Sequence, residues 1–241
     1  MNQKEIIQAI DGFSDHKILV IGDVILDAYF IGSVTRISPE APVSILDISK
    51  KEYRLGGAAN VALNIRGLGA TPILCSIIGN DSTGKTVLEL MQSQGLSLDG
   101  IQTSENRTTS LKTRLISSHH QLMRMDEEQT DLISEDDSNM LLKGISQIIE
   151  THNPSAIIFE DYDKGVLSPK LISSVMIMAK SKNIPTAVDP KKRNFLSYAG
   201  ATLFKPNLRE LRDGLNLPQL RPVPEDLNKA FASLKQIMPI E

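Results

Sequence analysis

The sequence predicts an α/β protein with a mostly parallel central sheet and a second, smaller β-sheet. Short apolar runs that end in a polar residue alternate with segments of helical periodicity, as in sheets whose strands are buried on both faces. Two stretches of alternating polarity interrupt that rhythm, and half-exposed strands have this pattern. With 41% hydrophobic and 23% charged residues, the chain has an ordinary globular composition, and we expect one domain over residues 1–241.

The composition narrows the classes of partner. A net charge of −3 argues against a nucleic-acid groove and against a membrane-attracted face. No segment approaches membrane-spanning length, the N-terminus has no signal-peptide core, and a cytoplasmic protein is expected. Cys75 is the single cysteine. It cannot form an internal disulfide, and its apolar surroundings indicate a buried, inert thiol.

The N-terminal half begins with a buried strand at 17–21, which ends at Gly22-Asp23. Extended pieces follow at 24–32 and 43–49, separated by prolines that disfavour a helix. Gly56-Gly57 then opens a helix with apolar residues at helical spacing. We further expect a strand at 72–78, a helix at 81–94 and a hairpin at 110–126. The segments at about 24–50 and 105–126 are expected to form the small sheet.

The C-terminal half alternates helices and strands. Acidic residues at 135–137 open a long helix, because they favour its positive end. Pro169 stands in the first turn of a second helix, at 168–182. The remaining elements are strands at 156–159, 185–188 and 202–204 and helices at 208–212 and about 225–237.

Polar residues gather where the predicted parallel strands end. Asp23, Asp161, Asp189 and Asn207 each come just after such a strand, at the sheet edge where open α/β sheets bind ligands. Asn60, near the start of the glycine-led helix, can donate and accept hydrogen bonds, as a polyhydroxylated ligand requires. The sequence therefore predicts a polar pocket there. The alternative is that the glycines make only a turn into a packing helix, and that Asp and Asn reflect turn preferences.

A competing phosphate site lies at Gly79–Thr86. Its glycines, Lys85 and Thr86 satisfy the P-loop pattern between a predicted strand and a predicted helix. Asp81 counts against a P-loop, because its carboxylate would repel phosphate, whereas Asp suits the N-cap of the helix. Lys85 would then lie on the outer face of that helix.

A family resemblance covers nearly the whole chain. It is carried by Gly22–Asp27, the stretch Arg-Ile-Ser-Pro-Glu-Ala-Pro at 36–42, Gly-Gly-Ala-Ala-Asn at 56–60, Glu-Asp-Tyr-Asp-Lys-Gly at 160–165, Asp-Pro-Lys at 189–191 and Pro-Asn-Leu-Arg-Glu at 206–210. In this order the segments resemble the ribokinase-like (PfkB) sugar kinases. The 36–42 stretch resembles the D-glycero-β-D-manno-heptose-7-phosphate kinase branch. The resemblance implies a three-layer α/β/α sandwich with a β-sheet lid, and Gly79, Asp81 and Gly84 match a family segment that is not a P-loop.

The resemblance also implies roles for single residues in binding the sugar. Asp23, Gly56, Gly57 and Asn60 match positions that hold sugar hydroxyls, and Asp161 matches an acidic pocket position. Arg36, Lys112 and Arg114 are expected to meet the sugar's 7-phosphate, because a guanidinium binds phosphate in a bidentate way. For Lys112 and Arg114, a solvated strand face remains the alternative.

For the nucleotide, Asn207 and Glu210 match the family's Asn-x-x-Glu motif. The resemblance implies that this motif organises Mg²⁺ and the ATP phosphates through water, in keeping with the hydration that Mg²⁺ retains. Lys191 and Lys205 would steady phosphate charge nearby, or are surface lysines. The lid would close over the sugar to limit ATP hydrolysis, and pairing of two lids would make a homodimer.

The implied reaction is ATP-dependent phosphorylation of the anomeric hydroxyl of D-glycero-D-manno-heptose 7-phosphate to the 1,7-bisphosphate, for ADP-heptose and lipopolysaccharide core biosynthesis. A kinase for another sugar or sugar phosphate and a non-catalytic sugar-phosphate-binding fragment are the alternatives. The family's Asp-Thr-x-Gly-Ala-Gly-Asp segment, which supplies the catalytic base, is absent from these 241 residues. We expect that the catalytic base lies beyond Glu241 and that the chain lacks the C-terminal part of the sheet. These 241 residues alone are therefore expected to turn over poorly. Glu160 and Lys205 stand where the branch usually has Ser and Thr.

Overall fold

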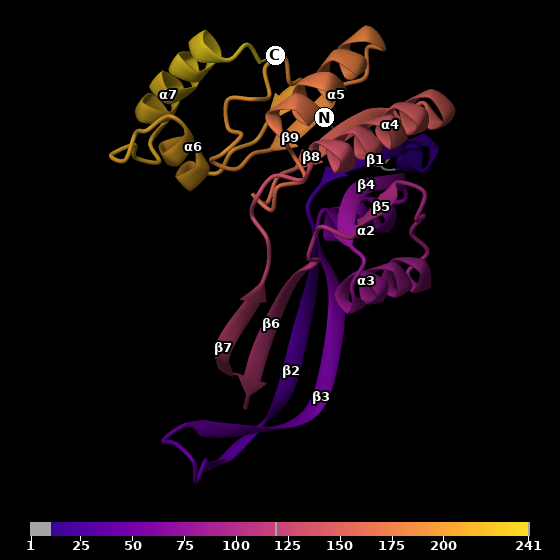
Figure 1. Ribbon diagram of the computed structural model, residues 1–241. Coiled ribbons are helices and arrows are strands. Elements are labelled where there is room, and N and C mark those ends of the chain that lie inside the picture. Colours follow the sequence, from indigo (N-terminus) through magenta and orange to yellow (C-terminus); the bar gives the residue numbers. More distant parts are fainter. Residues whose placement is uncertain (1–10, 119, 241) are drawn as a thin grey trace.

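The computed structural model describes residues 11–118 and 120–240. Helices cover both faces of a central sheet, and a long, narrow sheet projects from one end of that body (Figure 1). The central strands follow the order β10-β9-β8-β1-β4-β5, and every neighbouring pair is parallel. The predicted α/β class and the ribokinase-like arrangement of layers are confirmed. Residues 1–10, where no signal-peptide core was expected, lie outside the described residues.

The central strands match the predicted apolar runs with one exception. Their bounds are β1 (Lys17–Gly22), β4 (Thr71–Gly79), β5 (Ile101–Ser104), β8 (Ala156–Glu160), β9 (Thr186–Asp189) and β10 (Leu203–Phe204). The analysis of the sequence missed β5. It is a four-residue strand beside β4 at the sheet edge, and it contains the polar Gln102 and Thr103, so no buried apolar run marks it.

Two apolar cores lie on opposite faces of the central sheet. Leu19 and Ile21 of β1 face one core and Val20 faces the other, as alternating strand residues must. The first core contains α4 (Glu135–His152), α5 (Pro169–Ser181), α6 (Leu208–Gly214) and α7 (Pro224–Ile237). The second contains α2 (Ala58–Gly67) and α3 (Ser82–Ser93). A short 3-10 helix, η1 (Gly12–Asp15), precedes β1.

Side-chain caps fix where several of these helices begin. Ser134 accepts a hydrogen bond from Asp137 N–H at the start of α4, and Ser168 accepts one from Leu171 N–H at the start of α5. Each cap satisfies a backbone N–H group that has no partner within the helix. The acidic residues expected at the start of α4 and the proline expected at the start of α5 are both in place.

The projecting sheet, which we call the lid, has the strand order β3-β2-β6-β7. Its strands are β2 (Val24–Ile37), β3 (Ser44–Gly57), β6 (Ser110–Ser117) and β7 (His120–Glu127). β2 pairs antiparallel with β3 and parallel with β6, which pairs antiparallel with β7. The two predicted hairpins therefore form one sheet. Its first segment is longer than predicted, because β3 continues through Gly56-Gly57 up to the start of α2.

None of the helices in the described part of the chain combines the length and hydrophobicity that a membrane span requires.

Gly22 lets β1 and β8 approach each other at the functional edge of the sheet. A Cβ at this position would overlap the backbone carbonyl of Glu160. We therefore expect Gly22→Ala to lower the free energy of unfolding by about 1–3 kcal/mol, through overpacking against backbone that cannot yield. Urea unfolding would measure the change.

Gly67→Ala is the matched control, because a Cβ at Gly67 would meet no atom within 4 Å. This last residue of α2 should tolerate alanine with unchanged or higher stability. Equal losses in the two variants would contradict the close contact at Gly22.

Candidate active site

The side chain of Asp23 fastens a loop at the end of the central strand. Its Oδ2 accepts hydrogen bonds from the backbone N–H groups of Tyr162 (2.9 Å) and Lys164 (3.1 Å), and its Oδ1 accepts one from Val166 N–H (3.0 Å). Asp23 is 1% exposed. Burial raises the pKa of its carboxyl, the three N–H donors oppose that effect, and the nearby Asp161 charge adds to it. With roughly four lone-pair positions on a carboxylate, about one remains beyond these three hydrogen bonds.

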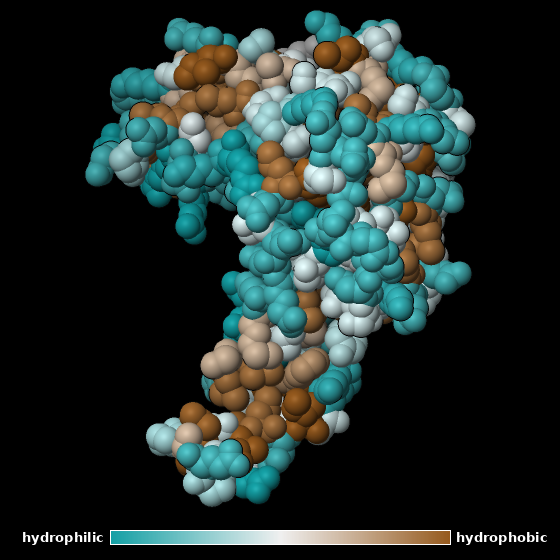
Figure 2. Space-filling view, in the orientation of Figure 1, coloured by the Kyte–Doolittle hydropathy of each residue, from teal (hydrophilic) through white to brown (hydrophobic). Residues whose placement is uncertain are grey.

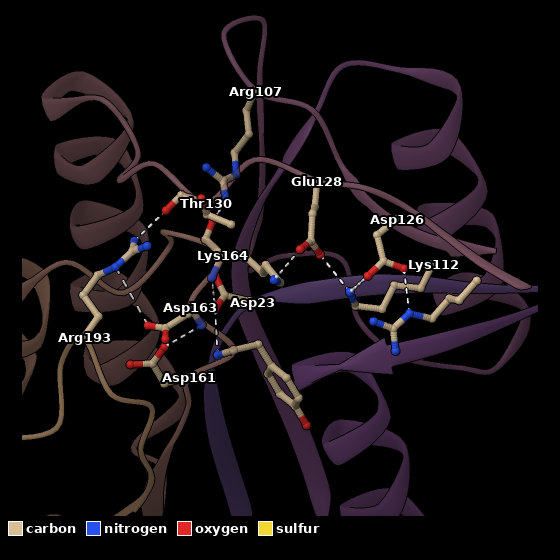
Figure 3. Close-up of polar contacts among 12 residues, drawn as sticks. Asp23, Arg107, Lys112, Asp126, Glu128, Thr130, Asp161, Asp163, Lys164 and Arg193 are labelled. Carbon is tan, nitrogen blue, oxygen red and sulfur yellow. Dashed lines mark hydrogen bonds and ion pairs between the residues drawn. The ribbon is translucent and has the colours of Figure 1, made fainter. Parts of the chain in front are cut away.

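Asp161 is the first residue of the same loop, and its side chain is buried. Its Oδ2 accepts hydrogen bonds from Asn194 Nδ2 (2.9 Å) and from the Tyr198 hydroxyl (3.0 Å), and its Oδ1 accepts one from Asp163 N–H (2.9 Å). Burial, together with Asp161, raises the pKa of Tyr198 well above its ordinary value. The expected acidic pocket position therefore anchors residues 161–167, which we call the 161–167 loop, through Asn194 and Tyr198. Figure 3 shows Asp161 beside Asp163.

Gly56 and Gly57 pack against the chain itself. A Cβ on Gly57 would overlap the carbonyl oxygen of Asp23, and one on Gly56 would overlap the Asp27 carboxylate. Gly57 also has φ = 57°, a left-handed value that glycine adopts at little cost. The family resemblance implies that these glycines lie at positions that hold sugar hydroxyls. In the structure they first allow β3 to pair closely with β2.

One face of the lid looks toward the 161–167 loop, and we call it the cleft face. Asp27 on β2 and Lys112 on β6 are register partners, so their side chains share this face. Lys112 Nζ contacts Glu128 Oε2 at 2.8 Å, and Glu128 Oε1 contacts Lys164 Nζ of the 161–167 loop, also at 2.8 Å. Figure 3 shows this chain of charges running from the lid to the loop.

Asn60 borders a cavity of about 340 Å³ beside the cleft face. Its lining also includes Asp27, Tyr29, Arg54, Leu63 and Gln94, so polar groups from β2, β3 and α2 meet there. The structure thus brings Asn60 together with carboxylate, phenol and guanidinium groups. Hydrogen-bonding groups of mixed type suit a polyhydroxylated ligand.

The cations expected to meet one sugar phosphate do not lie together. Lys112 is held by Asp126 and Glu128, and Arg114 donates to Asp27 Oδ1 at 2.5 Å. Arg36 is seven residues farther along β2 than Tyr29, the register partner of Arg114, which is a separation of roughly 23 Å. Arg36 is exposed at the distal end of the lid, 3.7 Å from Asp47. The structure therefore does not bring Arg36 together with Lys112 and Arg114 within one chain. Lys112 and Arg114 lie on a partly exposed strand face, in ion pairs, so their expected role toward the phosphate and the alternative of a solvated face both stay predictions.

Several residues of this cleft had no role in the sequence-based expectation. Arg54 and Tyr29 line the cavity, and Glu128 and Lys164 join the lid to the loop. Arg107 bonds the carbonyl oxygen of Lys164, and burial lowers its pKa. Because strand residues two apart share a face, the position of Asp27 could have predicted that Tyr29 lies on the cleft face. The roles of Glu128 and Arg107 could not be predicted in this way, because their partner Lys164 lies far away in sequence.

The residues expected to act on the nucleotide do meet. Asn207 Oδ1 accepts from Glu210 N–H (2.9 Å), and Glu210 Oε2 accepts from Asn207 N–H (2.8 Å), which makes a capping box at the start of α6. Glu210 Oε1 contacts Lys191 Nζ. Both Glu210 oxygens thus have protein partners, so any role toward Mg²⁺ fits better through water than through direct ligation. Within residues 11–118 and 120–240, no cluster of three or more His, Cys, Asp or Glu has a geometry suited to a metal ion.

The 79–86 segment differs from a phosphate-binding loop. Asp81 caps α3 by accepting from Gly84 N–H (2.6 Å) through Oδ1, and it accepts from Thr109 N–H (2.8 Å) through Oδ2. Gly79 N–H donates to Thr109 Oγ1 at 2.9 Å. A carboxylate thus occupies the position at which the P-loop interpretation requires phosphate, in agreement with the N-cap interpretation.

Glu160 and Asp189 end neighbouring strands and are register partners. Burial raises the pKa of Glu160 to about 7, Asp189 adds to the shift, and Lys205 and Lys191 oppose it. Lys205 Nζ lies 3.0 Å from Asp189 Oδ2, whereas Lys191 lies 3.6 Å from Asp189 Oδ1. A carboxylic acid with a pKa of about 7 therefore stands at the edge of the sheet where the parallel strands end.

Glu160→Gln tests this titration. Because folding raises the carboxyl pKa from its ordinary 4.5 to about 7, the folded state keeps the proton over that interval, and stability falls as pH rises through it. Gln mimics the protonated acid. We therefore expect the difference in unfolding free energy, variant minus native protein, to be about 1–3 kcal/mol more favourable to the variant at pH 8 than at pH 5. Urea unfolding at both pH values is the measurement, and an equal difference at both would contradict the raised pKa.

Comparison with curated proteins identifies relatives over most of the chain. It is 40% identical over 220 residues to the "Bifunctional protein HldE" of Methylobacillus flagellatus, covering 91% of this chain and 44% of that protein. It is 40% identical over 192 residues to the protein of the same name from Geobacter sulfurreducens, covering 80% of this chain and 39% of that protein. The chain thus spans less than half the length of these relatives.

Comparison with solved structures shows the same fold at low sequence identity. Phosphofructokinase-2 from Escherichia coli, in its tetrameric inhibited form, superposes with a TM-score of 0.69 at 19% identity over 93% of this chain and 71% of that one. Arabidopsis thaliana ribokinase complexed with ribose and ATP superposes with a TM-score of 0.64 at 16% sequence identity, covering 93% of this chain and 70% of that one. The model of the family described as "pfkB family carbohydrate kinase" matches residues 15–239. The chain therefore belongs to the pfkB family of carbohydrate kinases.

Proposed function

We propose that this chain is the kinase domain that phosphorylates the anomeric hydroxyl of D-glycero-D-manno-heptose 7-phosphate with ATP, which gives the 1,7-bisphosphate. The observation that carries the proposal is the cavity between the lid and α2, where Asn60 and Asp27 lie beside guanidinium groups. Hydroxyl-binding and phosphate-binding groups thus adjoin each other, as a phosphorylated sugar requires. The branch-specific stretch 36–42 favours a heptose among such sugars.

In this proposal the sugar hydroxyls contact Asn60 and the remaining acceptor position of Asp23. Gly56 and Gly57 place the backbone at the same end of the cleft. Asp161 acts indirectly, because it holds the 161–167 loop through Asn194 and Tyr198. The transfer forms a bond from the anomeric oxygen to the γ-phosphorus, breaks the bond to ADP, and releases one proton.

ATP would lie along the edge formed by the ends of β8, β9 and β10. Lys191 would balance phosphate charge, and the Asn207–Glu210 capping box would position water around Mg²⁺, which neutralises charge on the transferring phosphates. Lys191 Nζ also lies 5.7 Å from the centre of the Tyr162 ring, so the nucleotide edge adjoins the loop that Asp23 holds.

The lid would close over the bound sugar and pair with a second lid in a homodimer. Figure 2 shows apolar side chains gathered on the outer half of the lid. The exposed apolar residues of the lid as a whole are Ile37, Val43, Ile48, Tyr53, Leu122, Met123 and Met125. A contiguous apolar surface of this kind favours association.

Isothermal titration calorimetry tests the proposal directly. Heptose 7-phosphate, ribose and fructose 6-phosphate are titrated into the protein, with and without Mg-ATP. We expect selective binding of heptose 7-phosphate, because this ligand alone combines the heptose hydroxyls with a terminal phosphate. Selective binding of another sugar would overturn the heptose assignment, and binding of nucleotide without any sugar would overturn the kinase assignment.

Lys85→Ala is the control for the nucleotide site. Lys85 lies on α3, where the Gly84 N–H of the first turn donates to the Asp81 carboxylate. The affinity for Mg-ATP should therefore stay unchanged in this variant, whereas a P-loop would lose its nucleotide.

A further inference from the structure

Two arginines on the cleft face contact one aromatic ring. The guanidinium carbon of Arg54, on β3, lies 4.7 Å from the centre of the Tyr29 ring, and that of Arg114, on β6, lies 5.2 Å from it. β2, which carries Tyr29, runs between those two strands. The ring therefore holds guanidinium groups from both neighbouring strands. Arg54 and Tyr29 also line the cavity that contains Asn60.

Both guanidinium groups keep donors for a ligand. Arg114 bonds Asp27 Oδ1 and the Lys112 carbonyl oxygen through Nη1, and Arg54 bonds Glu52 Oε2 through Nη2. A guanidinium has five N–H donors, so other donors remain on each arginine. Stacking restricts the side-chain rotamers, which lowers the entropy lost when a bidentate phosphate contact forms.

Cations outnumber carboxylates in the ion pairs of the cleft face. Among the described residues, six cations share four carboxylates through direct ion pairs. The cations are Lys50, Arg54, Lys112, Arg114, Arg124 and Lys164, and the carboxylates are Asp27, Glu52, Asp126 and Glu128. Several cations thus share a carboxylate with another cation, and Arg54 shares Glu52 with Lys50. A phosphate monoester carries about −1.5 to −2 at neutral pH, so it is a strong partner for such shared cations.

We propose that Arg54 and Arg114, held by Tyr29, form the subsite that binds the phosphate group of a phosphorylated sugar. This inference rests on the proposed function, and it places the phosphate near the cavity at Asn60 rather than near Arg36. The sugar end of the ligand then lies in the cavity between the lid and α2. Arg54 determines specificity here, because it separates phosphorylated from free sugars.

The test compares Arg54→Ala and Arg54→Lys with Lys51→Ala. Lys51 Nζ lies 4.8 Å over the Phe30 ring on the same two strands, but on the other face, so it is a matched cation without the proposed role. Calorimetry measures binding of heptose 7-phosphate and of unphosphorylated heptose. We expect Arg54→Ala to lower the affinity for heptose 7-phosphate by about tenfold or more and the affinity for free heptose by less than about twofold. Arg54→Lys should restore little, because lysine lacks the planar fork, and Lys51→Ala should bind as the native protein does.

Each other outcome separates this inference from the proposed function. Unchanged binding of heptose 7-phosphate in Arg54→Ala overturns the subsite, and so does an equal loss for both sugars or a loss confined to Mg-ATP. A third outcome is that the native protein does not bind heptose 7-phosphate but binds fructose 6-phosphate or ribose 5-phosphate, and that Arg54→Ala weakens this binding. In that case the phosphate subsite is supported and the heptose assignment is wrong. If no sugar phosphate of the three binds, both are overturned. Circular dichroism and urea unfolding of the variants are the control, and we expect both to match the native protein because Arg54 is exposed.

Discussion

The buried carboxylate of Asp23 is the interaction on which the functional edge of this protein depends. Its two oxygens accept from three backbone N–H groups of the 161–167 loop, while the backbone of Asp23 accepts from Ala58 N–H and donates to the Glu160 carbonyl. One residue thereby joins the ends of β1 and β8, the start of α2 and the loop that carries Tyr162 and Lys164. Charge-assisted bonds of this kind are strong where water is excluded, so the loop keeps a fixed position facing the lid.

The lid is joined to that loop by a weaker, rearrangeable set of charges. Lys112, Glu128 and Lys164 form a partly exposed chain, and ion pairs near solvent each contribute little net stability. Such contacts can exchange partners when a charged ligand enters, without loss of the fold. The contacts at Asp23 therefore fix the loop, whereas the contacts at Glu128 join the lid to that loop less firmly.

Most of the fold could be predicted because each central strand except β5 is an apolar run that ends in a polar residue. The positions of Asp23, Asp161 and Asn207 at strand ends followed from the same pattern. The pattern did not predict the direction of each side chain. Asp161 points inward because Asn194 and Tyr198, which lie 33 and 37 residues later, donate hydrogen bonds to its carboxylate. The separation of Arg36 from Arg114 depends on the length of β2, and strand length is poorly marked where polar and apolar residues mix.

Hydrogen exchange at the backbone N–H groups of Tyr162, Lys164 and Val166 tests the role of Asp23 most directly. In the native protein these three should exchange more slowly than exposed loop amides, because each donates to a buried carboxylate. In Asp23→Ala they should lose that protection while Leu19 in β1 keeps its own, which shows that the sheet persists. Rapid exchange of the three in the native protein, or equal protection in the variant, would contradict the account.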